Sequence, residues 1–269
     1  MSAWSRFLGI SDDPESSEVL AARPVPGVRV EVRHLNKFFG PKHVLRDLDL
    51  TVEPGETFVI FGPSGCGKSV LLKHITGLLR PDSGSILVDG EDLQVENGVR
   101  RFRMAMVFQS SALFNSLSVG ENVGLWLKEH RICGRDEIAR IVAEKLRLVG
   151  LAGTERTMPS ELSGGMKKRV SIARALAVNP HLILYDEPTA GLDPVLTEQI
   201  GHVIADLKQL KITAIVVTHD LNLAAAVADR MGMIHEGHLI ESGPPAQIWS
   251  TTNPVVRAFL STQMKVPGR

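Results

Sequence analysis

Branched apolar residues alternate with polar residues in two segments near the start of the chain, residues 28–32 and 48–52. An alternation with a period of two places the apolar side chains on one face of a β-strand. The pattern therefore predicts two half-buried antiparallel strands. Residues 1–27 are polar and end in a Pro-Val-Pro-Gly run, and we interpret them and residues 263–269 as terminal tails.

Longer apolar runs follow, and they alternate with segments of helical spacing. Four runs have the length and composition of buried strands, namely residues 57–61, 104–108, 182–185 and 213–218. Helices are predicted at residues 69–79, 163–178 and 221–228, and we expect Pro81 and Gly84 to stop the first of them. Buried strands that alternate with helices are typical of a mostly parallel sheet, so the predicted fold class is α/β.

Residues 112–160 differ in character from the segments on either side. Ser118 is a suitable N-cap for a helix at residues 119–127, and residues 138–149 form a second amphipathic segment. We interpret this stretch as a helical subdomain inserted into a single α/β domain that spans residues 28–262.

Composition excludes some partners and compartments. Thirty basic residues balance thirty acidic residues, so no net field attracts nucleic acid, and no nucleic-acid partner is expected. No apolar run approaches the ~20 residues that a membrane helix needs, so we expect a cytoplasmic protein. Cys66 lies inside a glycine-rich loop where a disulfide with Cys133 would be obstructive, which favours a reducing compartment.

That glycine-rich loop lies between the predicted strand at residues 57–61 and the helix after it. Its residues are Gly62, Pro63, Ser64, Gly65, Cys66, Gly67, Lys68 and Ser69. Glycines at this spacing let successive backbone N–H groups point at phosphate oxygens beside a helix N-terminus. Lys68 is expected to reach the β- and γ-phosphates, and the Ser69 hydroxyl to bind a metal ion. The loop predicts a site for ATP and Mg²⁺.

Two acidic residues end the apolar run at residues 182–185. Asp186 is placed to hold Mg²⁺ through a water molecule. Glu187 follows it and is the candidate general base, which would polarise a water molecule for attack on the γ-phosphate. The pair predicts that the bound nucleotide is hydrolysed.

A Leu-Ser-Gly-Gly-Met segment stands between the phosphate loop and the acidic pair. Ser163 is a good N-cap, and Gly164 and Gly165 permit close approach of a phosphate to a helix N-terminus; we call these three residues the signature. With its motifs in this order, the chain resembles the ATP-binding subunits of ABC transporters over residues 28–260. The resemblance implies a P-loop NTPase fold of the ABC ATPase type, with an N-terminal antiparallel β portion, and ATP hydrolysis coupled to transport.

The resemblance assigns further roles by position. Gln109 matches the Q-loop glutamine, which touches Mg²⁺, and His219 matches the switch histidine that contacts the γ-phosphate. Phe39 matches the aromatic residue that stacks on adenine, with Phe38 as the alternative. The signature, together with Asp193 of the D-loop, would face the ATP bound by a second copy of the chain.

Partners also follow from the resemblance. It implies an integral membrane permease that holds the ATPase at the inner face of the cell membrane. Residues 110–117 include Leu113 and Phe114, which are exposed by pattern and rimmed by hydroxyl groups. We expect this segment to receive a short cytoplasmic helix of the permease.

Met166 departs from the commonest signature pattern, which has glutamine at that position. Methionine is familiar in the ATPases of Mla/Mce-type lipid transporters, and residues 112–114, 158–161 and 254–260 point to the same branch. The resemblance therefore implies transport of phospholipids or other lipids with an Mce-domain protein, and it leaves open whether a small accessory subunit is bound. The alternatives are an ABC importer of amino acids or other polar solutes and a soluble non-transport ABC ATPase.

Overall fold

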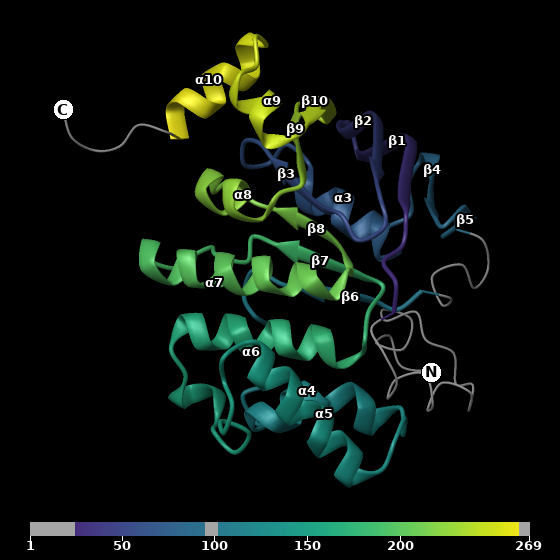
Figure 1. The fold of residues 1–269 in the computed structure, drawn as a ribbon. Coiled ribbons are helices and arrows are strands. Elements are labelled where there is room, and N and C mark those ends of the chain that lie inside the picture. The colour runs from purple at the N-terminus through teal and green to yellow at the C-terminus, as the bar shows by residue number, and fades with distance from the viewer. Residues whose placement is uncertain (1–24, 95–101, 264–269) are drawn as a thin grey trace, which may run out of the picture.

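A computed structural model describes residues 25–94 and 102–263, which form two β-sheets with helices packed around them (Figure 1). Most of the two predicted tails, residues 1–24 and 264–269, lies outside the described residues. Within the described ranges, no helix is both long enough and apolar enough to cross a membrane.

The smaller sheet is antiparallel and has the strand order β2-β1-β4-β5. Its strands are β1 (Val30–Phe39), β2 (Lys42–Val52), β4 (Ser83–Val88) and β5 (Glu91–Asp92). Val30 pairs with Val52 and Val32 pairs with Leu50, and all four side chains are buried. The predicted antiparallel pair is confirmed, and both strands continue further toward the turn between them.

The larger sheet has the order β10-β9-β3-β8-β7-β6. Its strands are β3 (Thr57–Phe61), β6 (Met104–Val107), β7 (Leu182–Asp186), β8 (Thr213–Val217), β9 (Arg230–His235) and β10 (His238–Gly243). Neighbours pair in parallel from β6 to β9, and only β10 is antiparallel to its neighbour. The prediction of a mostly parallel sheet is confirmed. The carboxyl ends of β3, β6, β7 and β8 consequently lie at the same end of the sheet.

The central strands are buried on both faces, which explains their continuous apolar runs. On β3, Phe58 and Ile60 pack toward α3 and the smaller sheet. Val59 and Phe61 pack toward the helices on the opposite face. Successive side chains of a strand point to opposite faces, so one short strand contributes to two cores. Helix α3 (Lys68–Ile75) lies on the face toward the smaller sheet. The helices on the opposite face are α6 (Gly164–Ala177), α7 (Pro194–Leu207) and α8 (Leu221–Val227).

Two helices have a boundary that lies three residues or more from the predicted one. Helix α3 ends at Ile75, although its apolar pattern continues for several residues. Gly77 has a φ of 71°, a left-handed conformation that ends helices, so this glycine stops α3 before Pro81 is reached. Helix α5 (Arg135–Leu148) begins earlier than predicted, because acidic residues in its first turn favour a helix N-terminus.

Helices α4 (Val119–Glu129) and α5 pack on α6 at the end of the molecule opposite α10 (Pro254–Gln263) (Figure 1). Ser118 caps α4 as predicted: its hydroxyl accepts the Glu121 N–H at 3.2 Å, and the Glu121 carboxylate accepts the Ser118 N–H at 2.8 Å. Gly124 lets α4 approach α5, because a Cβ there would lie 2.9 Å from Ile138 Cγ2. The division into a core and a helical subdomain stays a prediction. The other helices of the described residues are η2 (Pro159–Glu161), η3 (Lys208–Leu210) and α9 (Pro245–Trp249).

Candidate active site

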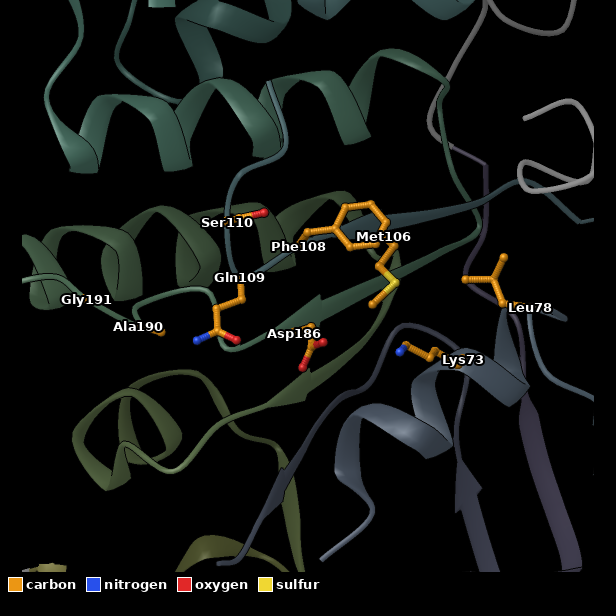
Figure 2. A pocket seen from close by; sticks show the side chains of 9 residues that line it. All are labelled: Lys73, Leu78, Met106, Phe108, Gln109, Ser110, Asp186, Ala190 and Gly191. Atoms are coloured by element: carbon orange, nitrogen blue, oxygen red, sulfur yellow. The ribbon is translucent and has the colours of Figure 1, made fainter. Parts of the chain in front are cut away.

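Four parallel strands deliver predicted site residues to the same end of the larger sheet. β3 leads into the phosphate loop, and β7 ends at Asp186. Gln109 and His219 come shortly after β6 and β8. A cavity of about 630 Å³ opens at this end (Figure 2). It is lined by Lys73, Leu78, Met106, Phe108, Gln109, Ser110, Asp186, Ala190 and Gly191.

The phosphate loop takes the curled conformation that its glycines permit. Gly62, Gly65 and Gly67 have φ values of 145°, 79° and 108°. A Cβ at Gly62 would lie 2.2 Å from the Ile234 carbonyl oxygen, so a larger residue cannot occupy that position without displacing the backbone. Helix α3 begins directly after Gly67, and its N-terminal N–H groups are therefore directed at the loop.

Lys68 is buried against this loop, with only 7% of the residue exposed. Its Nζ donates to the carbonyl oxygens of Gly62 and Pro63, at 2.8 and 2.9 Å. The ammonium group is thus held beside the loop and the helix N-terminus. Positive charge and backbone donors together make a site suited to a phosphate.

Ser69 and Asp186 connect the start of α3 with the end of β7. The Ser69 hydroxyl donates to Asp186 Oδ1 at 2.7 Å. Burial raises the pKa of the Asp186 carboxyl, and the hydrogen bond from Ser69 opposes that rise without reversing it. Gln109 and Asp186 both line the cavity (Figure 2). A hydroxyl, a carboxylate and a side-chain amide are the hard oxygen ligands that Mg²⁺ prefers, so these residues fit a magnesium ion.

Glu187 and His219 contact each other beyond the ends of β7 and β8. Glu187 Oε2 accepts from His219 Nδ1 at 2.8 Å and from the His219 backbone N–H at 3.3 Å. Glu187 has a φ of 48°, an unusual value for a non-glycine residue, and its N–H donates to the Val217 carbonyl at 2.9 Å. Its side chain is 14% exposed. This backbone conformation presents an oriented carboxylate at the solvent boundary, where it can accept a proton from water.

The signature and the D-loop lie side by side at the starts of two neighbouring helices. Ser163 caps α6 by accepting the Met166 N–H at 3.2 Å, and Asp193 caps α7 by accepting the Leu196 N–H at 2.9 Å. Gly165 packs so closely that a Cβ would lie 3.0 Å from the Leu196 side chain. Neither the signature nor Asp193 lines the cavity of Figure 2.

The two phenylalanines near the end of β1 are exposed to the same extent, 46%. Phe38 stacks on His43, with ring centroids 3.9 Å apart and ring planes 13° apart. The Phe39 ring has Lys37 Nζ at 5.6 Å from its centroid. One face of Phe38 is already covered by another ring, and the adenine contact of Phe39 stays a prediction.

Lys168 is a residue near the site that the sequence interpretation did not single out. It is 5% exposed, and its Nζ donates to the backbone carbonyl of Gln109. The available signal was its place one helical turn before Ile172, on the apolar side of the predicted helix at residues 163–178. A basic residue on a buried helix face needs a partner, and here the partner is the main chain at a predicted metal ligand.

The order and geometry of these motifs can be compared with known proteins. The family model described as ABC transporter matches residues 45–190. The chain is 45% identical over 241 residues to the probable ribonucleotide transport ATP-binding protein mkl of Mycobacterium tuberculosis, covering 87% of this chain and 67% of the relative. It is 38% identical over 262 residues to the Arabidopsis thaliana protein TRIGALACTOSYLDIACYLGLYCEROL 3, chloroplastic, covering 90% and 76%. It is 42% identical over 219 residues to the Escherichia coli glutamine transport ATP-binding protein GlnQ, covering 80% and 91%.

A solved structure shares the fold. It is a dimeric post-hydrolysis state of the ATP-binding cassette MJ0796 bound to ADP and phosphate, with a TM-score of 0.72 and 32% identity, covering 80% of this chain and 98% of that one. The family model spans more than half of the chain, from β2 to the segment after β7. The chain therefore belongs to the ABC transporter family, as an ATP-binding subunit that hydrolyses ATP.

Proposed function

We propose that this subunit energises the movement of phospholipids or other lipids across a cell envelope, with an integral membrane permease and an Mce-domain protein as partners. The permease would hold it at the cytoplasmic face of the membrane. The observation that carries the lipid assignment is the plant relative, whose name is that of a galactolipid and which matches 90% of the chain at 38% identity. Met166 in the signature segment supports the same branch, and its side chain packs against the core cluster around α6.

Import of a polar solute is the second candidate. GlnQ is 42% identical to the chain, and the name of the mycobacterial relative refers to ribonucleotides. To discriminate, the tagged chain is purified from membranes in mild detergent, and its co-purifying proteins and extracted lipids are identified. A permease with an Mce-domain protein and enriched phospholipid supports lipid transport. A permease with a soluble solute receptor, and no enriched lipid, contradicts it.

Binding of ATP uses the phosphate loop and the predicted metal ligands. The N–H groups of the phosphate loop and the Lys68 ammonium bind the β- and γ-phosphates of ATP. Ser69, Asp186 and Gln109 would hold Mg²⁺, which supplies positive charge against the phosphate oxygens. Asp186 would do so through a water molecule, and its hydrogen bond with Ser69 keeps these two side chains together before the nucleotide binds.

Hydrolysis then depends on Glu187. It accepts a proton from a water molecule whose oxygen bonds to the γ-phosphorus, while the bond from that phosphorus to the β–γ bridging oxygen breaks and ADP departs. Both hydrogen bonds that His219 donates to Glu187 go to the Oε2 atom, so the Oε1 atom can face the water molecule. His219 therefore orients the base, and its exposed ring edge can also approach the γ-phosphate.

We further propose that two copies enclose two ATP molecules, each between the phosphate loop of one copy and the signature of the other. Gly164 is exposed at the start of α6, so the backbone donors of that helix can be approached from outside the chain. The MJ0796 cassette is dimeric, which supports the pairing of two copies.

The segment after Gln109 is proposed to receive the permease. Phe114 is 42% exposed. Its backbone is fixed by Asn122, which is completely buried: the Asn122 side chain accepts the Phe114 N–H at 2.8 Å and donates to the Phe114 carbonyl at 3.0 Å. The prediction that Leu113 is also exposed is wrong, since its side chain is half-buried and packs against the core. A single apolar side chain on a held backbone is thus presented for an amphipathic partner.

Phe114→Ala is expected to leave ATP binding by the free subunit unchanged and to weaken its association with the permease. Loss of one aromatic anchor at the centre of an interface typically costs about 2 kcal/mol or more, roughly a 30-fold loss of affinity. Val255→Ala is the matched control, because Val255 is a 38% exposed apolar residue on α10. Co-purification with the permease and nucleotide affinity are measured for both variants. Equal permease recovery, or joint loss of both properties in Phe114→Ala, contradicts the docking role.

A further inference from the structure

Lys168 is a buried cation that has no role in the hydrolysis described above. It lies on α6, and 5% of the residue is exposed. Burial lowers the pKa of its ammonium group, while the charges of Asp186 and Glu187 act in the opposite direction. A buried ammonium group is retained at a free-energy cost unless its donors are used. A contact that uses the donors of Lys168 would therefore explain its burial.

Its contact is the main chain of Gln109, since Nζ donates to that carbonyl oxygen. Arg174, further along the same helix, donates to the Ser111 carbonyl at 2.9 Å and to the Ala112 carbonyl at 2.7 Å. Ser111 and Ala112 both have left-handed φ values, 62° and 45°. Two cations of α6 thus hold an unusual turn directly after β6, and Lys168 holds the residue that faces the cavity. Hydrogen bonds from charged donors are the stronger kind, which suits such a turn.

Helix α6 also carries the signature at its N-terminus. It is one uninterrupted α-helix from Gly164 to Ala177, so Ser163, which caps it, and Lys168 belong to the same element. Figure 2 shows the Gln109 side chain beside Asp186 in the same cavity. A single rigid helix therefore links the surface proposed to meet the ATP of a second copy with the proposed metal ligand of its own site.

We propose that Lys168 is a positioning residue, which anchors the Gln109 main chain to the signature helix and thereby directs the Gln109 side chain toward Mg²⁺. The inference rests on the proposed metal site and names the residue that sets one of its ligands. Through α6, closure of the signature on the ATP of the second copy would order the metal ligands around the ATP of its own site.

The test compares the affinity of the full chain for ATP in Mg²⁺ with its affinity in EDTA. All variants and the reference chain carry Glu187→Gln, so that hydrolysis of ATP is slow during the measurement. Lys168→Met keeps the length and apolar stem of the side chain but removes its donors. We expect the gain in affinity due to Mg²⁺ to fall about tenfold, the lower limit for losing a group that orients a metal ligand. Affinity in EDTA stays unchanged, Lys168→Arg restores most of the gain, and the control Lys167→Met, at the adjacent half-buried lysine, retains it.

A second arm asks whether Lys168 acts through Gln109. In a Gln109→Ala background, Lys168→Met is expected to cause no further loss, because the side chain that it positions is gone. Additive losses, or an equal loss in EDTA, overturn the proposal, since Lys168 would then act on the carboxylates or on the fold. If Lys168→Met does not fold, Lys168→Gln is used with the same expectations. If the ATP affinity of the Glu187→Gln chain without further substitution does not depend on Mg²⁺, the proposed metal site itself is contradicted.

Discussion

Glu187→Gln is expected to retain ATP binding while turnover falls by roughly 10²-fold or more, as is typical for the loss of a general base. The glutamine carbonyl can still accept from His219 Nδ1, so the geometry around Oε2 is kept and only the basicity is lost. ATP turnover of the intact transporter complex and ATP affinity of the chain are measured. The loss of turnover is expected only when the carboxylate that accepts the proton, Glu187, is replaced.

Glu198→Gln is the matched control for this substitution. Its side chain is 73% exposed on α7, where the same chemical change should leave turnover within a factor of two. Glu187→Gln should also accumulate as an ATP-dependent dimer, because the closed state is formed but not resolved by hydrolysis. Near-normal turnover in the intact complex would falsify the role of Glu187 as base.

Turnover per chain of the isolated subunit is expected to fall about tenfold for each tenfold dilution below the dissociation constant of the dimer, by mass action. The physical reason is that each phosphate loop needs the signature of a second copy. ATPase rate is measured over a dilution series beside the molar mass in solution. A constant rate per chain at dilutions where only monomer is present contradicts the two-copy site.

Gly164 offers a direct probe of that surface. A Cβ at Gly164 would lie 3.4 Å from the Leu192 side chain, so there is room for a side chain to begin at this position. Gly164→Glu places negative charge where a phosphate of the second copy is proposed to bind, and we expect it to abolish ATP-dependent dimerisation. Gly164→Ala is the control and should dimerise. Dimerisation of both variants contradicts the signature contact.

The sequence by itself determined the features that depend on near neighbours along the chain. The strand at residues 57–61 has the predicted bounds because both of its faces are apolar, and the Ser118 cap forms with a residue three positions away. The spacing of Gly62, Gly65 and Gly67 identifies a phosphate loop because the backbone curvature is local. These signals sufficed for the family and for ATP hydrolysis.

Only the tertiary structure decided which distant residues meet and which cations are buried. Chain order does not give the strand order β3-β8-β7-β6, so the contact of Ser69 with Asp186 follows from sheet topology. Periodicity marks Leu113 and Phe114 alike, yet only Phe114 is exposed, because the turn held by Asn122 and Arg174 directs them differently. Burial and hydrogen-bond partners depend on packing across the chain, and no local pattern encodes that packing.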